Sequence, residues 1–445
     1  MRESNEIPHD WENVKLSDVC DKITDGSHFS PKSVDIGFPY VTVKDLKNDT
    51  IDFSKCLKIS KKDYDNLSRN DCNPLRNDVL FSKDGTVGKV ALINFDLQFV
   101  VLSSLAILRP LSNIILSEYL FYILKSSHFL LQALNQKKGV AIRRIILRDL
   151  KEINLNLPPL PEQHRIVAKI EELFSSLDTG IESLKTAQQQ LKVYRQAVLK
   201  WAFEGRLTNK NVAEGQLPEA WKWKQIKEIT AVLGDGLHGT PSYSEAGEYY
   251  FINGNNLSDG KIEIKANTKC VTIEEYEKYK KPLNEKTIFV SINGTLGNTA
   301  FYNGEKIILG KSACYFNVQN TVDKQYVRYC ITSQRFLNYA HKNATGSTIK
   351  NVGLKAMREF EIPLPPTIEE QHAIVAEIES RLSVCDKIEE SIEQSLRQSE
   401  SLRQSILKKA FEGKLVPQNP NDEPASKLLE RIKAQKEKTA SKKRR

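Results

Sequence analysis

The feature that most constrains this chain is an internal repeat. The segment LPPLPEQHRIVAKIEELF at residues 157–174 returns as LPPTIEEQHAIVAEIESRL at residues 364–382. Beyond one inserted residue, positions 163–207 and 371–415 stay in register at an offset of 208, with 21 identities in 45 positions. Two unrelated surface helices are the simpler alternative, but they would not share so many residues. We therefore interpret the chain as a tandem duplication.

Each copy of the repeat is predicted to form one long helix. In the first copy, apolar residues recur at spacings of three, four or seven from Ile166 to Val198, as in a coiled-coil seam. Tandem prolines precede each run, and Gly205 or Gly413 follows it as a C-terminal cap. A helix over residues 161–203 would be about 60 Å long. The second copy has a weaker seam, which consists of Ile374, Ile378, Cys385, Ile392 and Ile406. We therefore expect the second helix to pack against the first.

The repeat extends into the segments between the helices. Trp11 matches Trp221, and TDGSHFSP at residues 24–31 matches GDGLHGTP at residues 234–241, so His28 recurs as His238 beside an Asp-Gly turn. A histidine in a loop is commonly structural, but its recurrence also fits a polar contact residue. Asp-Gly and Asn-Gly at residues 84–85 and 293–294 predict hairpin turns in which both central residues have positive φ. In each half we expect a compact mixed α/β domain of roughly 150 residues.

Composition excludes several classes of protein. No run of about 18 apolar residues spans a membrane, and the polar, acidic N-terminus is not a signal peptide. Seven scattered cysteines without ligand spacing indicate reduced thiols in a cytoplasmic protein without structural zinc. The last thirteen residues carry +6 of the net charge of +9, so positive and negative charges nearly cancel in the rest of the chain. We expect this basic tail to be disordered after a short helix.

Catalytic motifs are missing from the sequence. GTVGK and GTLGN lack the spacing of a phosphate-binding loop, and no Walker A motif could drive translocation. Leu157-Pro158-Pro159-Leu160 lacks the acid or amide and the aromatic residue of an adenine methylase loop. We therefore predict that enzyme chemistry comes from partner subunits and that the chain holds no metal.

The segments PLPEQHRIVAKI and AFEGRL, their second copies, and NPNDEPASKLLERI near the C-terminus resemble the specificity subunit of type I restriction-modification enzymes. The resemblance covers almost the whole chain. It implies an α+β fold with two target recognition domains, separated by two long antiparallel helices and related by a pseudo-twofold duplication. The implied boundaries are residues 1–156 and 209–363 for the domains, 157–208 and 364–416 for the helical spacers, and 417–445 for a C-terminal helix and basic tail.

The resemblance also implies a function. The chain would bind double-stranded DNA, each domain would read one half of an asymmetric bipartite target, and the helices would set the gap. It would lack a catalytic centre and bind two methyltransferase subunits, and the full complex would add two restriction and translocation subunits. S-adenosylmethionine, ATP and Mg²⁺ would then act on partner subunits, with no cofactor in this chain.

Polar and basic loop residues are the candidates for base and phosphate contacts, although each is also compatible with an ordinary surface position. In the first domain they are His28, Lys32, Lys83, Lys89, Lys137, Lys138, Arg143 and Arg144. In the second they are His238, Thr240, Asn293, Lys342, Asn343, Thr348 and Lys350. Residues repeated on the helices, expected to be exposed, are candidates either for docking the methyltransferase or for packing the helices together: Gln163, Arg195, Glu204, Gln371, Arg403 and Glu412.

Two other functions compete with this one. The chain could be the recognition portion of a restriction-methylation enzyme with its catalysis in the same polypeptide, which the missing motifs disfavour. It could also be a coiled-coil scaffold without DNA specificity, which leaves the two divergent globular domains unexplained.

Overall fold

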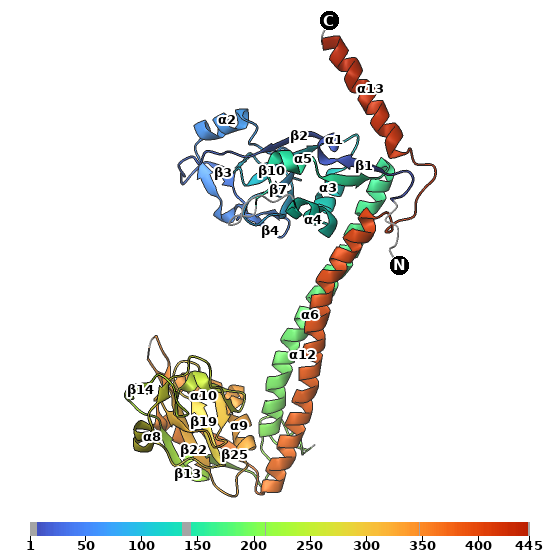
Figure 1. Cartoon of the computed structure of the whole chain (residues 1–445). Coiled ribbons are helices and arrows are strands. Elements are labelled where there is room, and N and C mark those ends of the chain that lie inside the picture. The colour runs from blue at the N-terminus through green and yellow to red at the C-terminus, as the bar shows by residue number, and fades with distance from the viewer. Residues whose placement is uncertain (1–6, 136–143, 210, 347, 444–445) are drawn as a thin grey trace. The chain divides into compact units, whose positions relative to one another are not determined.

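A computed structural model of the chain describes residues 7–135, 144–209, 211–346 and 348–443. Contacts divide the chain into two compact units, which we describe separately. Unit 1 combines Met1–Ser183 with Gln394–Arg445, and unit 2 is Leu184–Glu393. Each unit therefore contains one globular part and sections of two long helices, α6 (Leu160–Phe203) and α12 (Ile368–Phe411), both labelled in Figure 1.

The helix predicted over residues 161–203 is confirmed by α6, which begins one residue earlier. The seam of α6 is buried at its two ends, for example at Ile166 and Val198, and between them it is partly buried or, at Tyr194, exposed. The weaker seam of α12 is confirmed as well, because all five of its predicted residues are buried: Ile374, Ile378, Cys385, Ile392 and Ile406. The apolar period of each helix therefore identified the face that packs.

The two helices pair in the same way in both units. In unit 1, Arg403 of α12 forms an ion pair with Asp178 of α6. In unit 2, Arg195 of α6 lies 2.7 Å from Asp386 of α12. The two arginines, like the two aspartates, are 208 positions apart, which is the offset of the repeat. The same antiparallel contact is thus made twice, once by each copy.

The globular part of unit 1 is built on an antiparallel four-stranded sheet with the order β2-β10-β7-β8. Its strands are β2 (Cys20–Asp25), β10 (Leu105–Pro110), β7 (Val79–Ser82) and β8 (Val90–Leu92). Smaller sheets are formed by β1 (Glu12–Lys15) with β11 (Asn154–Leu157), by β3 (Phe38–Val41) with β6 (Leu57–Ile59) and β9 (Val100–Val101), and by β4 (Leu46–Lys47) with β5 (Thr50–Ile51). The helices are α1 (Leu16–Val19), α2 (Lys61–Arg69), α3 (Ser117–Leu124), α4 (Ser127–Asn135) and α5 (Leu147–Lys151).

The globular part of unit 2 repeats this topology, with the sheet order β13-β22-β19-β20. Its strands are β13 (Thr230–Asp235), β22 (Ala313–Val318), β19 (Thr287–Ser291) and β20 (Thr299–Phe301). The smaller sheets contain β12 (Lys222–Gln225), β25 (Glu361–Leu364), β14 (Tyr243–Ser244), β18 (Cys270–Val271), β15 (Tyr250–Ile252), β21 (Ile307–Leu309), β16 (Leu257–Ser258), β17 (Lys261–Ile262), β23 (Ala344–Thr345) and β24 (Asn351–Val352). The helices are α7 (Ile226–Ile229), α8 (Ile273–Tyr279), α9 (Lys324–Thr332), α10 (Gln334–Asn343) and α11 (Leu354–Glu359). The predicted duplication of mixed α/β domains is confirmed at the level of strand order.

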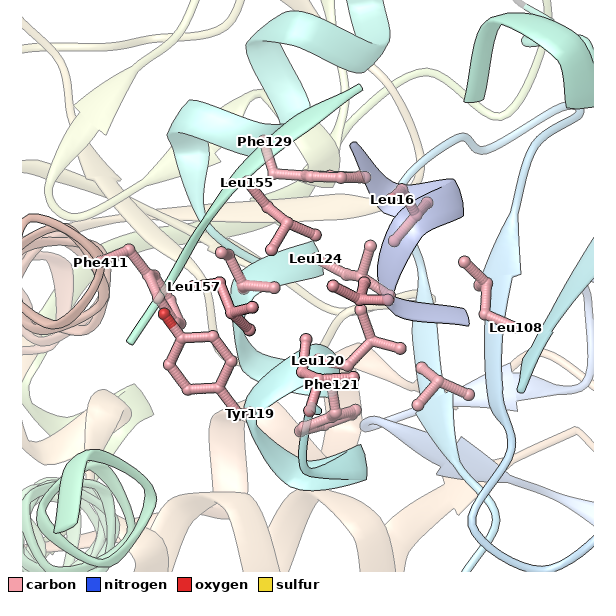
Figure 2. Close-up of a cluster of buried hydrophobic side chains, with 14 of the residues drawn as sticks. Leu16, Leu108, Tyr119, Leu120, Phe121, Leu124, Phe129, Leu155, Leu157 and Phe411 are labelled. Atoms are coloured by element: carbon pink, nitrogen blue, oxygen red, sulfur yellow. The ribbon is translucent and has the colours of Figure 1, made fainter. Parts of the chain in front are cut away.

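The end of a long helix enters the core of each globular part. Figure 2 shows Phe411 of α12 beside Tyr119 of α3, next to the leucines of β11. The two rings meet edge to face at 5.3 Å, and the Tyr119 hydroxyl donates to the Asn156 carbonyl over 2.9 Å. In unit 2, Phe203 of α6 makes the same contact with Tyr326 at 5.5 Å. Each globular part is therefore stabilised by the final turn of a helix that begins in the other unit.

The glycine that follows each helix is required by its backbone conformation and by the close approach of a proline ring. Gly413 has φ 71° and Gly205 has φ 74°, in the left-handed region that glycine enters without strain. A Cβ at Gly413 would lie 2.3 Å from Cγ of Pro8, and one at Gly205 would lie 2.4 Å from Cγ of Pro218. The predicted C-terminal caps are confirmed, and the close approach of a proline explains why no larger residue fits.

Two local predictions need correction. The strands β7 and β8 pair as a hairpin, and so do β19 and β20, but the connecting loops are longer than two residues. Within the predicted Asp-Gly and Asn-Gly turns, only the glycines have positive φ. The basic C-terminal tail is not disordered throughout, since α13 (Ala425–Lys443) continues through most of it. Alanine, lysine and glutamate, which fill this segment, favour helix. Within the described ranges, no helix has the length and apolar character needed to cross a membrane.

Candidate nucleic-acid interface

In unit 1, the sheet brings four chain segments together where its strands begin and end. Because β10 runs antiparallel to both β2 and β7, its start lies beside the ends of those two strands. Backbone hydrogen bonds then join the segments: Lys83 N–H donates to Ser104 O over 2.9 Å, Ile145 N–H donates to Lys83 O over 2.9 Å, and Ser27 bridges Leu102. We call residues 25–29, 83–85, 102–104 and 144–145 loop cluster 1.

Unit 2 contains the same arrangement, made by residues 235–238, 292–294, 310–312 and 350–352, which we call loop cluster 2. Ile292 N–H donates to Ser312 O over 2.9 Å, and Val352 N–H donates to Ile292 O over 2.8 Å. Leu237 bridges Gly310. The backbone scaffold of the two clusters is thus equivalent, segment by segment.

The glycine of each predicted Asp-Gly-x-His turn permits a close backbone approach. A Cβ at Gly26 would lie 2.0 Å from Val101 O, and one at Gly236 would lie 2.2 Å from Leu309 O. The histidine two residues later is exposed in both clusters and faces the turn aspartate. His28 Nε2 lies 3.2 Å from Asp25 Oδ2, and the corresponding distance from His238 to Asp235 is 2.5 Å. Each turn therefore exposes an imidazole to solvent and holds it against the carboxylate of the turn aspartate.

Loop cluster 1 contains a chain of charges centred on a buried lysine. The Lys83 side chain is only 2% exposed, and its Nζ lies 3.2 Å from Asp25 Oδ2 and 3.5 Å from Asp84 Oδ2. Asp84 in turn lies 3.4 Å from Nε of the half-exposed Arg144. Lys83, a candidate for a DNA contact, is not an ordinary surface lysine, because two carboxylates hold its buried ammonium group. Lys83 instead orients the acids beside His28 and Arg144.

Loop cluster 2 replaces this charge chain with neutral groups. Ile292 stands at the position of Lys83, while Asn293 and Asn351 take the positions of Asp84 and Arg144. Thr348 and Lys350, on the segment leading to Asn351, are exposed. The same scaffold therefore presents different hydrogen-bonding groups in the two units.

Other predicted contact residues lie beside the clusters or are engaged elsewhere. Lys32 and Thr240 are exposed on the loops that follow the two histidines, and Lys342 and Asn343 are exposed at the end of α10. Lys89 is partly buried and its ammonium group donates to two backbone carbonyls, those of Val43 and Leu46, so it fastens a loop. The predicted residues Lys137, Lys138 and Arg143 lie outside the described residues.

The six residues predicted on the long helices have different environments. The expectation that Gln163 and Gln371 are exposed is wrong, since each is at most 1% exposed. The Gln163 amide accepts from Leu116 N–H and donates to two carbonyls, and Gln371 accepts from Asp323 N–H, so both tie a loop to the start of a helix. Arg195 and Arg403 join α6 to α12, which fits the packing alternative. Glu204 and Glu412 remain partly exposed next to the caps: their side chains are 16% and 26% exposed.

Sequence reasoning missed the partners of the residues that it selected. Asp25 and Asp84 were predicted only as turn residues, and Asn351 was not singled out, although aligning GVAIRR at residues 139–144 with GSTIKN at residues 346–351 places Arg144 opposite Asn351. Within the part of the chain that the structure describes, no group of three or more histidine, cysteine or acidic side chains could hold a metal ion. The chemistry of the clusters is hydrogen bonding and charge pairing.

Comparison with known proteins gives one consistent result. Residues 8–192 and 218–398 each match the family model for the type I restriction modification DNA specificity domain. The chain is 25% identical, over 99% of its length, to the type I restriction enzyme EcoKI specificity subunit of Escherichia coli K12, of which it covers 98%. It is 24% identical, over 93% of its length, to the MjaVIII specificity subunit of Methanocaldococcus jannaschii, of which it covers 95%.

Solved structures share the fold. The HsdS subunit from Thermoanaerobacter tengcongensis aligns with 92% of this chain and 98% of its own, with a TM-score of 0.61 and 20% identity. A chain from a study of complex assembly and conformational transition of the type I R-M system aligns with 92% of this chain and 99% of its own, with a TM-score of 0.67 and 20% identity. Each of the two stretches matched by the family model contains one loop cluster.

Proposed function

The chain belongs to the type I restriction-modification DNA specificity family, and from that premise we propose that it reads a double-stranded DNA target in two parts. Loop cluster 1 contacts one half-site and loop cluster 2 contacts the other. Specificity subunits of these systems are not catalytic themselves, so recognition is the contribution of this chain to the complex.

One observation carries this proposal: the two clusters have equivalent backbones and different polar side chains. A shared scaffold lets both domains approach a duplex in the same way, since their elements have the same order and pairing. Base identity is read by the side chains that reach base edges, while basic residues hold phosphates. Because the clusters present Asp84 and Arg144 in one case and Asn293 and Asn351 in the other, the two half-sites differ in sequence.

We further propose that the repeated helices dock the modification subunits. Glu204 and Glu412 recur next to the two helix caps and keep part of their surface exposed, so they offer two equivalent contacts for two methyltransferase subunits. Arg195 and Arg403 contribute by holding the helices in register. In this scheme the partners bind S-adenosylmethionine, ATP and Mg²⁺, and two restriction and translocation subunits complete the assembly. The helix pair sets the gap between the half-sites.

The proposal is tested by co-expressing the chain with the methyltransferase subunit encoded beside it and mapping methylated adenines across a genome. We expect one asymmetric, two-part motif with a gap of constant length. A complex that forms but methylates no defined motif would contradict recognition and favour a scaffold.

Matched variants assign the halves of the motif. His28→Ala changes a side chain of loop cluster 1 that is largely exposed, and His238→Ala changes its counterpart in loop cluster 2. Each variant should relax only one half of the motif. Relaxation of both halves by either variant would mean that the clusters do not act separately.

A further inference from the structure

One pair of positions has the same backbone pairing in the two clusters but carries different side chains. Asp84 and Arg144 form an isolated antiparallel bridge in loop cluster 1, and Asn293 and Asn351 form the corresponding bridge in loop cluster 2. Next to each bridge, one further backbone hydrogen bond joins the same two segments. Ile145 N–H donates to Lys83 O over 2.9 Å in loop cluster 1, and Val352 N–H donates to Ile292 O over 2.8 Å in loop cluster 2. The side chains at these two positions therefore start from equivalent backbone geometry.

The surface beside the pair is open. Gly85 and Gly294 follow the first residue of each bridge with φ 71° and 77°, and a Cβ built on either would meet no atom within 4 Å. Arg144 has a half-exposed side chain, and Asn351 is partly exposed. Among the described residues, none lies within 4 Å of a Cβ added at either glycine, so this side of each pair is open to a large ligand such as a duplex.

In loop cluster 1 the pair presents an oriented guanidinium group. Nε of Arg144 lies 3.4 Å from Asp84 Oδ1, and the Arg144 side chain makes no hydrogen bond to any described residue. Asp84 is itself held by the buried ammonium group of Lys83. An arginine drawn toward a neighbouring carboxylate still offers a planar fork of N–H donors, which matches the O6 and N7 acceptors of guanine in the major groove.

In loop cluster 2 the pair presents two carboxamides. Among the residues that the structure describes, neither the Asn293 nor the Asn351 side chain has a hydrogen-bond partner, and both are partly exposed. An amide offers one acceptor and a donor group side by side, which matches the N6 donor and N7 acceptor of adenine. Uncommitted amides at an open loop edge are suited to such a contact.

We infer that this pair of positions selects one base in each half-site: Arg144, supported by Asp84, reads a guanine, and Asn351, supported by Asn293, reads an adenine. The inference rests on the proposed function and makes it specific. A phosphate contact by Arg144 is the alternative, because a basic surface residue can serve either purpose.

The test uses the full chain in complex with its methyltransferase subunits and a library of randomised duplexes, from which bound DNA is sequenced. The key variant is Asp84→Asn with Arg144→Asn, which gives loop cluster 1 the pair of loop cluster 2. We expect one guanine of the first half-site to be replaced by adenine, with a change in relative preference on the order of 10- to 100-fold, and the second half-site to be unchanged. Asn293→Asp with Asn351→Arg should produce the reverse exchange in the second half-site only.

Arg144→Lys separates the two roles of a basic residue and alters only a half-exposed side chain, so the core stays intact. Lysine retains the charge but not the planar fork. We expect weaker discrimination at that guanine and a change in total affinity of only a few-fold. If Arg144→Asn instead weakens binding to all sequences equally and Arg144→Lys behaves as the wild type, Arg144 contacts phosphate and the inference is overturned.

The outcome also distinguishes this inference from the proposed function. A wild-type complex that enriches no motif would refute recognition itself. A wild-type complex that enriches a two-part motif which all of these variants leave unchanged would refute only the assignment of the bases.

Discussion

At the scale of single residues, an indole supports a glutamate at the start of each long helix. Trp11 Nε1 donates to Glu162 over 3.0 Å, and Trp221 Nε1 donates to Glu370 over 2.9 Å. Glu162 is 1% exposed, whereas Glu370 is partly exposed and can exchange its lost partner for water. We predict that Trp11→Phe lowers the free energy of unfolding of unit 1 by about 2–3 kcal/mol, and that Trp221→Phe costs unit 2 about 1 kcal/mol. Hydrogen exchange of peptides from β1 and β12 measures each unit separately, and equal losses would contradict the burial argument.

The cost of Trp11→Phe should depend on pH. Burial raises the pKa of the Glu162 carboxyl above its usual value, and the hydrogen bonds from Trp11 and Gln418 oppose that rise. The native state therefore binds this proton more tightly than the unfolded chain does. The contribution of Glu162 to stability is complete at low pH and is lost as the pH rises through the raised pKa. The indole stabilises the ionised form, so the variant should approach wild-type stability near pH 4 and show its full loss near pH 8, in urea unfolding at each pH.

Lys83 offers a second residue-scale comparison, because loop cluster 2 contains isoleucine at the same position. Lys83→Ile removes the counter-charge of Asp25 and Asp84 and should cost unit 1 about 2–4 kcal/mol. Adding Asp84→Asn recreates the combination found in loop cluster 2 and should recover at least about 1 kcal/mol, since it removes one of the two acids that lost the Lys83 counter-charge. Hydrogen exchange in β7 and β10 follows both variants. A double variant no more stable than the single one would show that the charges are not coupled.

Individual residues were predictable from the sequence only as far as the repeat extended. The matched tryptophans and histidines were identified, but the Glu162 partner of Trp11 lies 151 positions away and no local pattern indicates it. Gln163 was expected at the surface because it is a polar residue repeated on both long helices. The structure buries it under the segment that contains Ile114 and Leu116. The loop clusters depend on the strand order β2-β10-β7, which spacing along the chain does not determine.

At the scale of elements, the glycine caps can be tested against a glycine in the middle of the same helix pair. Gly413→Ala places a Cβ against Pro8 and forces a left-handed backbone, so it should destabilise unit 1 by at least about 1–2 kcal/mol. A Cβ added at Gly180, inside α6, would meet no atom within 4 Å, and Gly180→Ala should instead stabilise by about 0.5–1 kcal/mol. Thermal unfolding compares the two. A neutral Gly413→Ala would mean that Pro8 moves freely.

Elements whose apolar residues recur with a regular spacing were predicted well, and elements defined by tertiary contacts were not. The heptad spacing gave α6 and the buried face of α12, because a long two-helix seam needs little information from elsewhere in the chain. The hairpins were expected to turn in two residues, yet the loops between their strands are extended by contacts with the neighbouring segments of each cluster. The short strands of the smaller sheets, some only two residues long, have no period at all.

At the scale of the whole molecule, unit 1 is assembled from two distant parts of the chain. Its core includes residues that come only from the C-terminal segment: Ile406, Leu407, Ala410, Phe411, Ala425, Leu428 and Ile432. Fully burying one large apolar side chain contributes about 1.5–3 kcal/mol, so losing several removes as much as a whole domain usually has, about 5–15 kcal/mol.

We predict that a chain ending at Glu393 keeps unit 2 folded and loses unit 1. Limited proteolysis followed by mass spectrometry should leave residues 184–393 protected and digest residues 8–183. Adding residues 394–445 as a separate peptide is the control and should restore protection. Equal protection of both regions in the truncated chain would show that the C-terminal segment is dispensable for the core.

The divided composition of unit 1 also sets an order of events during synthesis on the ribosome. Unit 2 is one continuous stretch, whereas the last section of unit 1 starts roughly 210 residues after the first section ends. At typical elongation rates of about 5–20 residues per second, this interval lasts on the order of 10–40 s. The half that emerges first is therefore completed last, and during that interval its apolar face is available to chaperones, proteases and other nascent chains.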